Sequence, residues 1–116
     1  YRFNDIPWFD PIHLSIDEQG HSPFTRWFLN INAIAAAKIT TALYRLAQGN
    51  VSNTKSVGKG VFKYKVNFSP GYRIYYALDE NTLVILLNGG TKQRQKNDIR
   101  LSQKFWNDYK KRKKVD

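Results

Sequence analysis

Cationic and phenolic side chains alternate with apolar ones in the segment Val61–Leu78. Side chains of these types can catalyse the cleavage of a phosphate diester. One predicted face of this segment carries Lys63, Lys65, Arg73 and Tyr75. An arginine stabilises the charge of a phosphorane through two parallel donors, and a lysine among other cations has a lowered pKa that suits a general acid or base. A tyrosine can stack on a base or donate a proton. Lysines on a strand face are otherwise simply solvated, and a tyrosine can fill the surface between strands.

Short elements must position these side chains, and their order indicates the fold class. The sequence predicts a strand at Ile12–Asp17, a helix that starts at Ser22-Pro23, a second helix capped by Asn32 and ended by Gly49, strands at Val61–Ser69, Tyr72–Leu78 and Leu83–Asn88, and a final helix that opens at Gly89-Gly90-Thr91. We expect a single α+β domain over residues 1–116, in which a small antiparallel sheet has an N-terminal helical hairpin and a C-terminal helix packed on one face. Residues 1–11 are expected to form an irregular arm, and residues 51–59 a polar connector.

A three-residue loop, Ser69-Pro70-Gly71, is predicted to join the first two strands of this sheet. It would place Asn67 opposite Arg73 and bring the apolar side chains of both strands onto one face. The same register puts Lys65 opposite Tyr75. The face that carries these four side chains is then predicted to be cationic and exposed to solvent.

Basic side chains are concentrated in two parts of the chain. The net charge is +10, and residues 1–50 contribute none of it. Residues 51–73 carry five basic side chains and no acidic one, whereas residues 91–116 carry ten basic and three acidic side chains. This asymmetry favours a polyanionic partner, nucleic acid or ribosome, over the alternative of a soluble protein with a basic surface. The run Lys110–Lys114 either binds nucleic acid or complements the dipole of the final helix.

Several other classes of protein and site do not match the composition. The chain has no cysteine, which excludes a disulfide framework and a thiolate metal site. His13 and His21 stand apart from other metal-ligating residues, so we expect no metal and no other cofactor. No segment has the length of a membrane span and no signal-peptide pattern is present, so a cytoplasmic location without a membrane partner is expected. The stretch 89–92 is either a phosphate-binding helix start or a simple strand-to-helix turn.

Six segments, taken together and in order, resemble a known protein family, although each segment alone is too short to indicate one. They read, in this order, SPFTRWF, LYRLAQGN, SVGKGVFKYKV, SPGYRIYYA, LVILLNGGTKQRQKNDI and FWNDYKKR. Together they resemble the RelE/ParE toxin superfamily, and within it the HigB-like branch of addiction module killer proteins. The resemblance implies a RelE-like fold and a toxin that pairs with a helix-turn-helix antitoxin. Many relatives bind in the A site of the 30S ribosomal subunit and cut mRNA there without a metal.

The resemblance also implies roles for single residues. Arg73 matches the family arginine that contacts the scissile phosphate. Lys55 and Lys59 stand where basic residues approach the RNA, and Lys92 and Gln95 match polar positions after the double glycine. The chain ends in a long basic helix rather than in the short tail that carries a catalytic tyrosine or histidine in some RelE relatives, so no proton-transfer residue is assigned.

We therefore expect the toxin of a type II toxin–antitoxin system, a metal-independent and ribosome-dependent mRNA endonuclease that inhibits translation. The candidate catalytic residues are Arg73, Lys59, Tyr75 and Lys92. The candidate RNA-binding residues are Lys55, Lys63, Lys65, Gln95, Lys110, Lys111 and Arg112. Two alternatives remain open: a DNA gyrase inhibitor of the ParE type, which has the same fold, and a non-enzymatic nucleic-acid-binding module.

Overall fold

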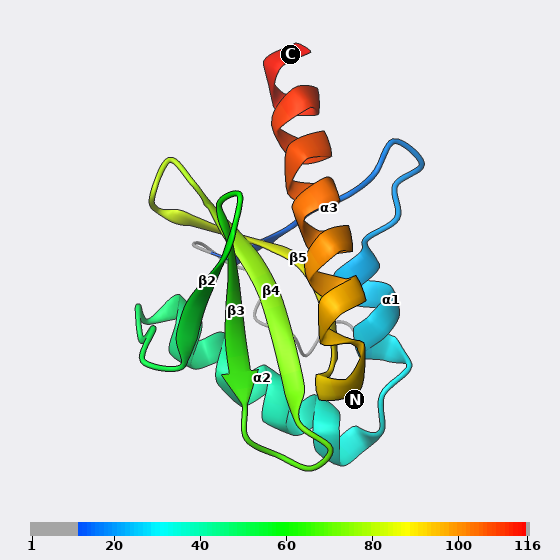
Figure 1. Cartoon of the computed structure of the whole chain (residues 1–116), viewed down its shortest axis with the longest axis vertical. Helices are drawn as coiled ribbons and strands as arrows, with labels where there is room; N and C mark the ends of the chain where they lie inside the picture. Colours follow the sequence, from blue (N-terminus) through cyan, green and yellow to red (C-terminus); the bar gives the residue numbers. More distant parts are fainter. Residues whose placement is uncertain (1–11, 116) are drawn as a thin grey trace.

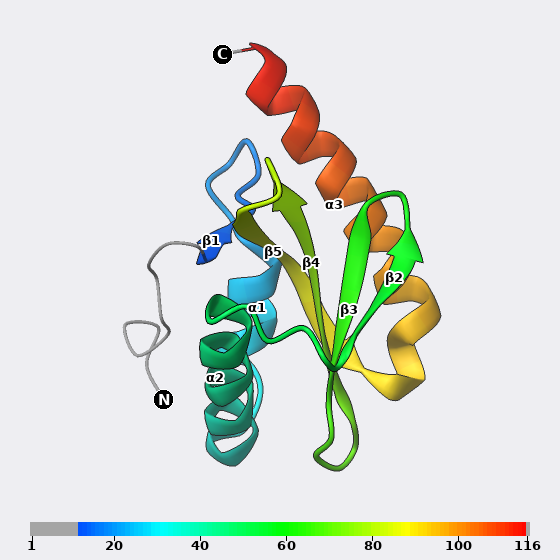
Figure 2. The same ribbon diagram turned by 90° about the vertical axis from the view of Figure 1, so that its left-hand side faces the viewer.

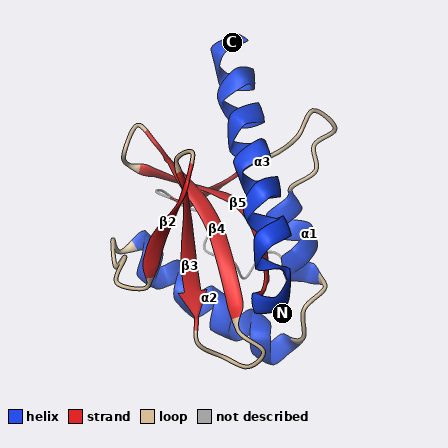
Figure 3. Ribbon diagram, in the orientation of Figure 1, coloured by secondary structure: helices blue, strands red, loops and turns tan. Residues whose placement is uncertain are grey.

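A five-stranded sheet with helices on both faces forms the part of the chain that the computed structural model describes, residues 12–115 (Figures 1 and 3). The strands lie in the order β1 (Ile12–Leu14), β5 (Leu83–Thr91), β4 (Tyr72–Asp79), β3 (Val61–Val66) and β2 (Thr54–Gly58). β1 runs parallel to β5, and the other neighbours are antiparallel. The α+β class is confirmed. The irregular arm expected at residues 1–11 lies outside the described residues.

Two helices cover one face of the sheet and a third covers the other (Figure 2). α1 (Pro23–Leu29) and α2 (Ala33–Ala47) form the predicted hairpin. On the opposite face a 3₁₀ turn, Lys92–Arg94, leads into α3 (Gln95–Val115). The expectation that all helices pack on one face is wrong, because β4 and β5 are buried on both faces and each face therefore needs a cover.

Each of the two faces has its own hydrophobic cluster. The larger one, between the sheet and the helices α1 and α2, includes Phe24, Phe28, Ile39, Leu43, Tyr64, Ile74 and Tyr76. The smaller one, between the sheet and α3, consists of Val61, Tyr75, Ala77, Ile85, Leu87 and Trp106. The aromatic residues of the predicted helices therefore contribute to the core, as expected.

The helix boundaries are confirmed at three predicted caps. Ser22 accepts a hydrogen bond from the backbone of the first turn of α1 at 3.1 Å, and Pro23 occupies the first helical position. Asn32 accepts a backbone hydrogen bond in the same way at the start of α2, at 2.8 Å. Gly49 follows the end of α2 with a φ of +84°, a conformation that favours glycine.

β3 and β4 pair two residues away from the predicted register. Arg73 lies opposite Lys65, where Asn67 was expected, and Tyr75 lies opposite Lys63. A shift of two residues keeps every side chain on its predicted face, because side chains alternate with a period of two. The cationic side chains and the tyrosine therefore share one face as predicted, although their direct neighbours differ.

The loop between these two strands is longer than the predicted three residues, since it spans residues 67–71. Phe68 leaves the ladder: its ring stacks on that of Tyr72 with 6.3 Å between the centroids, and its N–H donates to the carbonyl oxygen of Val66 at 2.9 Å. Phe68 thus packs against the larger cluster without pairing as a strand residue. Because Phe68 is apolar and continues the alternation, the sequence predicted a strand up to Ser69, whereas β3 ends at Val66.

The double glycine belongs to β5 and does not open the final helix. A Cβ at Gly89 would collide with the indole ring of Trp27, and a Cβ at Gly90 would collide with the carboxyl group of Asp98. The pair therefore allows α1 and α3 to approach the sheet closely from opposite faces. The interpretation of this stretch as a phosphate-binding helix start is wrong.

Two strands also differ from their predicted extents. Residues 54–58, within the expected polar connector, form β2 at the edge of the sheet. The strand expected at Ile12–Asp17 ends at Leu14. The side chains of the edge strand β2 are mostly exposed to water and can therefore be polar. For this reason the sequence of β2 shows no alternation of apolar and polar residues.

Candidate nucleic-acid interface

Strand pairing and the start of α3 gather five predicted site residues around one cavity of about 310 Å³. These residues are Lys55, Lys63, Lys65, Arg73 and Gln95. Residues 52–54 complete the lining, and none of the described residues that line the cavity is acidic. The space lies where β2, β3 and β4 meet the start of α3, and we refer to it as the basic cavity.

Like charges face each other across the strands of the basic cavity. Lys55 pairs with Lys63 between β2 and β3, and Lys65 pairs with Arg73 between β3 and β4. Like charges directly opposite each other destabilise a sheet. An anion in the cavity would remove this repulsion, so the arrangement suits the binding of a phosphate group.

Lys63 is the half-buried lysine of the cavity. Its Nζ donates a hydrogen bond of 2.6 Å to Oε1 of Gln95, which ties β3 to the start of α3. Burial, and to a lesser degree the charge of Arg73 and of the two lysine neighbours, lowers the pKa of Lys63. A lysine with a lowered pKa exchanges its proton more readily near neutral pH.

Arg73 is buried, with only 4% of its surface exposed, so the expectation of a solvent-facing arginine is wrong. The physical reason is that α3 covers this face of the sheet. The guanidinium still borders the basic cavity and lies close to Gly71, where a Cβ would be 2.9 Å from Nη1 and 3.7 Å from Cβ of Lys92. Lys92 therefore lies near Arg73, on the other side of Gly71.

Tyr75 is fully buried, and its predicted place on an exposed face is also wrong. It packs in the smaller cluster under α3, and its hydroxyl has no partner among the described residues. Burial, followed by the negative charge of Asp98, raises the pKa of Tyr75 to about 12. In this position Tyr75 cannot stack on a base from solvent.

Asp98 is a buried polar residue that the sequence analysis did not single out. Its carboxyl group lies against Gly90 in the first turns of α3, and Oδ2 has no hydrogen-bond partner in the described part of the chain. Burial raises its pKa, and the charge of Arg94 opposes this effect. The signal in the sequence was the double glycine, which leaves room above the sheet for a carboxyl group.

Two predicted site residues lie away from the basic cavity, in a groove between the β2–β3 turn and α3. Lys59 is in the turn with a φ of +56°, and Lys110 projects from α3 with Nζ 5.5 Å from the centre of the Trp106 ring. The residues that line the space are Lys59, Arg100, Gln103, Lys104, Trp106, Asn107 and Lys110. We refer to it as the helix groove. The structure does not bring Lys59 to Arg73.

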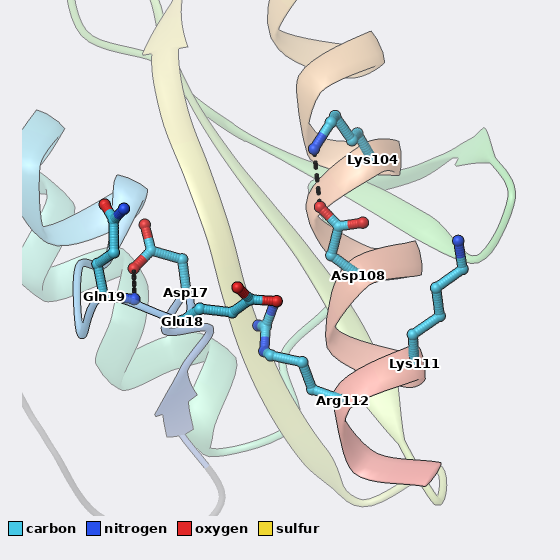
Figure 4. Close-up of a pocket in the computed structure, with 7 residues that line it drawn as sticks. All are labelled: Asp17, Glu18, Gln19, Lys104, Asp108, Lys111 and Arg112. Atoms are coloured by element: carbon cyan, nitrogen blue, oxygen red, sulfur yellow. Dashed lines mark hydrogen bonds and ion pairs between the residues drawn. The ribbon is translucent and has the colours of Figure 1, made fainter. Parts of the chain in front are cut away.

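Lys111 and Arg112 line a third space, which carries both signs of charge (Figure 4). It lies between α3 and the turn after β1, and its acidic residues are Asp17, Glu18 and Asp108. Backbone N–H groups, above all that of His21, lower the pKa of Asp17, and Arg112 adds to the effect. Figure 4 shows Arg112 reaching toward the carboxylate of Glu18, whereas Lys111 is turned away from Asp17 and Glu18.

The described residues show neither a cluster of ligating side chains for a metal nor a membrane-spanning element. No three histidine, aspartate or glutamate side chains in residues 12–115 come close enough together to hold a metal ion. None of the helices in this range combines the length and the apolar character needed to cross a membrane.

Two comparisons with known proteins relate the chain to a family. The sequence model of the family described as "Phage derived protein Gp49-like (DUF891)" matches residues 26–106. An "Uncharacterized protein" of Haemophilus influenzae (strain ATCC 51907 / DSM 11121 / KW20 / Rd) is 40% identical over 78 residues, which are 66% of this chain and 79% of that protein. The family match runs from within α1 through α2 and β2 to β5 as far as Trp106 in α3, and so includes the whole basic cavity.

Proposed function

Because the chain belongs to the Gp49-like family, a family of toxin–antitoxin toxins within the RelE/ParE-like toxin superfamily, we propose that it cuts mRNA on the ribosome. Membership of the superfamily also implies an antitoxin as its partner. The finer proposal is a type II toxin of the HigB-like branch that inhibits translation in the cytoplasm. A helix-turn-helix antitoxin would silence it, and the A site of the 30S subunit would present the mRNA.

The basic cavity is the observation that carries the proposal. Its cations face one another in like-charged pairs, and none of the described residues around it supplies a carboxylate. Such an arrangement costs stability and is best explained by binding of a polyanion.

In the proposed reaction the 2′-hydroxyl of one nucleotide attacks the adjacent phosphate. The hydroxyl loses a proton, a bond forms between the 2′ oxygen and phosphorus, the bond to the 5′ oxygen breaks, and that oxygen takes up a proton. Arg73 stabilises the charge of the phosphorane from the wall of the cavity. Lys63 is the proposed proton-transfer residue, because it lines the cavity together with Arg73 and burial lowers its pKa. The strand would be held by Lys55, Lys65, Lys92 and Gln95.

The composition of the cavity supports the proposed dependence on the ribosome. None of its described lining residues is a histidine or a carboxylate, so acid–base catalysis has few groups to draw on. Correct positioning of reacting groups can supply about 7–11 kcal/mol of a barrier. The ribosome would provide it by holding the 2′-hydroxyl in line with the scissile bond.

The test compares three substrates under the same conditions. The purified protein is incubated with free RNA, with ribosomes programmed with the same RNA, and with DNA gyrase and plasmid. We expect cleavage of the ribosome-bound mRNA, little cleavage of free RNA and no DNA breaks. Equal rates on free and ribosome-bound RNA would refute the positioning argument. DNA breaks with intact mRNA would overturn the proposal in favour of a gyrase inhibitor.

A further inference from the structure

The helix groove is a second cationic space, formed by residues from two separate elements. Its cations are Lys59 from the β2–β3 turn and Arg100, Lys104 and Lys110 from α3, and all four are exposed. None of the described residues that line the groove is acidic. Cations therefore face the groove from two sides, as they do in sites that follow a nucleic-acid backbone.

Contacts between the hairpin and the helix hold the groove in shape. Nε2 of Gln103 donates to the carbonyl oxygen of Val57 at 3.0 Å, and Gly60 lies so close to Trp106 that a Cβ would be 2.9 Å from its Nε1. Because both walls are fixed in the free protein, a ligand would bind without much ordering of the protein.

Most cations of the helix groove have no carboxylate partner among the described residues, whereas cations at neighbouring positions of α3 lie near acidic residues. Lys113 is held by Asp79 at 2.7 Å, and Lys111 and Arg112 line the mixed-charge space of Figure 4. Within the groove, Lys104 pairs with Asp108, a residue at the rim of another space, at 2.8 Å. No carboxylate of the described residues pairs with Lys59, Arg100 or Lys110 within 4.0 Å. These three cations remain available to phosphate groups.

The β2–β3 hairpin and α3 lie side by side (Figure 2), and both the groove and the basic cavity take lining residues from these two elements. Two hydrogen bonds join the hairpin to α3 at successive positions of the helix, Lys63–Gln95 and Gln103–Val57. Since an α-helix rises 1.5 Å per residue, the helical positions from Gln95 to Lys110 extend over about 22 Å. This length matches a few nucleotides of extended single strand.

We propose that the helix groove binds the phosphate backbone of the RNA strand that continues from the basic cavity. The footprint then runs along α3 to Lys110 and excludes Lys111 and Arg112. The proposal rests on the proposed function only in taking RNA as the ligand of the basic cavity. An acidic protein segment is the less suitable occupant, because Trp106 is only 8% exposed and the groove offers little apolar surface to anchor a peptide.

Binding of a 12-nucleotide 2′-O-methyl RNA, which lacks the attacking hydroxyl, tests the proposal independently of cleavage. Fluorescence anisotropy over a range of salt concentrations compares Arg100→Gln/Lys110→Gln with the matched control Lys111→Gln/Arg112→Gln, which removes two charges from the same helix outside the groove. Arg100, Lys110 and Lys111 are exposed and Arg112 is half-buried, and matching melting curves would verify the folds. Loss of two phosphate contacts is expected to make the salt slope shallower by about 1.4 in the groove variant, with no change in the control.

Each outcome separates this proposal from the proposed function. A shallower slope only in the groove variant supports the groove even if the protein cuts no RNA. Equal slopes in both variants would overturn the groove even if ribosome-bound mRNA is cut. An unchanged RNA slope together with weaker binding of the purified antitoxin would show that the groove is a protein-docking site, which also contradicts the proposal.

Discussion

One hydrogen bond is expected to hold the C-terminal half of α3 to the sheet. The hydroxyl of Tyr109 donates to Oδ2 of Asp79 at 2.8 Å, and Nζ of Lys113 donates to both oxygens of the same carboxylate. Tyr109→Phe removes only the hydroxyl and leaves Asp79 paired with Lys113. A hydrogen bond to a charged group contributes about 1.5–3 kcal/mol. We expect the lower end of this range, about 1.5 kcal/mol, because the carboxylate keeps its two hydrogen bonds from Lys113 after the substitution.

Urea unfolding at pH 7 measures this loss as a lower midpoint with an unchanged slope. The control is the same substitution in an Asp79→Asn background, where the bond is no longer charge-assisted and the loss is expected to fall to about half. An equal loss in both backgrounds would show that the hydroxyl does not act through Asp79, and would refute the reasoning.

The same bond has a defined dependence on pH. Hydrogen bonds from Lys113, and then from Tyr109, hold the pKa of Asp79 below its usual value of 3.8. A group with a depressed folded pKa contributes stability above the unfolded value and loses it as the pH falls through the folded value. The effect of Tyr109→Phe is therefore expected to be constant near neutral pH and to shrink below about pH 4.

Two further predictions concern the contact between α3 and β5. Gly90→Ala is expected to destabilise the fold by about 1–3 kcal/mol in urea unfolding, because its Cβ would occupy the place of the Asp98 carboxyl group; an unchanged midpoint would mean that α3 does not lie this close to the sheet. Asp98→Asn is expected to raise the melting temperature at pH 7, because burial raises the pKa of Asp98 and its ionised form destabilises the native state. This advantage should disappear below about pH 3.8, where the carboxyl group is protonated in both states, and a lower melting temperature at pH 7 would show that the carboxylate has a stabilising partner.

Alternation in the sequence predicted the faces of β3 and β4 correctly but not their register. Faces depend only on the period of two, whereas register also depends on where the strand ends, and Phe68 is apolar yet leaves the ladder to stack on Tyr72. The edge strand β2 was missed because its polar residues carry no apolar alternation. The second helical cover was not predicted, although the apolar side chains on both faces of Leu83–Leu87 indicated that this strand is buried on both sides.

The sequence predicted several residues of the basic cavity, but it did not predict correctly where all the candidate residues lie. Lys63 and Arg73 meet in the basic cavity as expected, since neighbouring strands bring them together. Lys59 and Tyr75 do not belong to that surface, because one lies in a hairpin turn and the other lies beneath α3. Asp98 was missed because its burial depends on the close approach of α3 to Gly90, and the double glycine alone does not show which side chain lies over it.

The rate of mRNA cleavage on programmed ribosomes tests the central claim most directly. Lys63→Gln and Arg73→Lys are compared with Lys96→Gln, which removes a charge from an exposed position of α3 outside the basic cavity. Removal of a proton-transfer or charge-stabilising group is expected to slow single-turnover cleavage by about 10²-fold or more, with Lys96→Gln within about twofold of the unaltered protein. Lys63→Gln and Arg73→Lys proteins that fold and still cut at the unaltered rate would contradict the assignment of the basic cavity as the cleavage site.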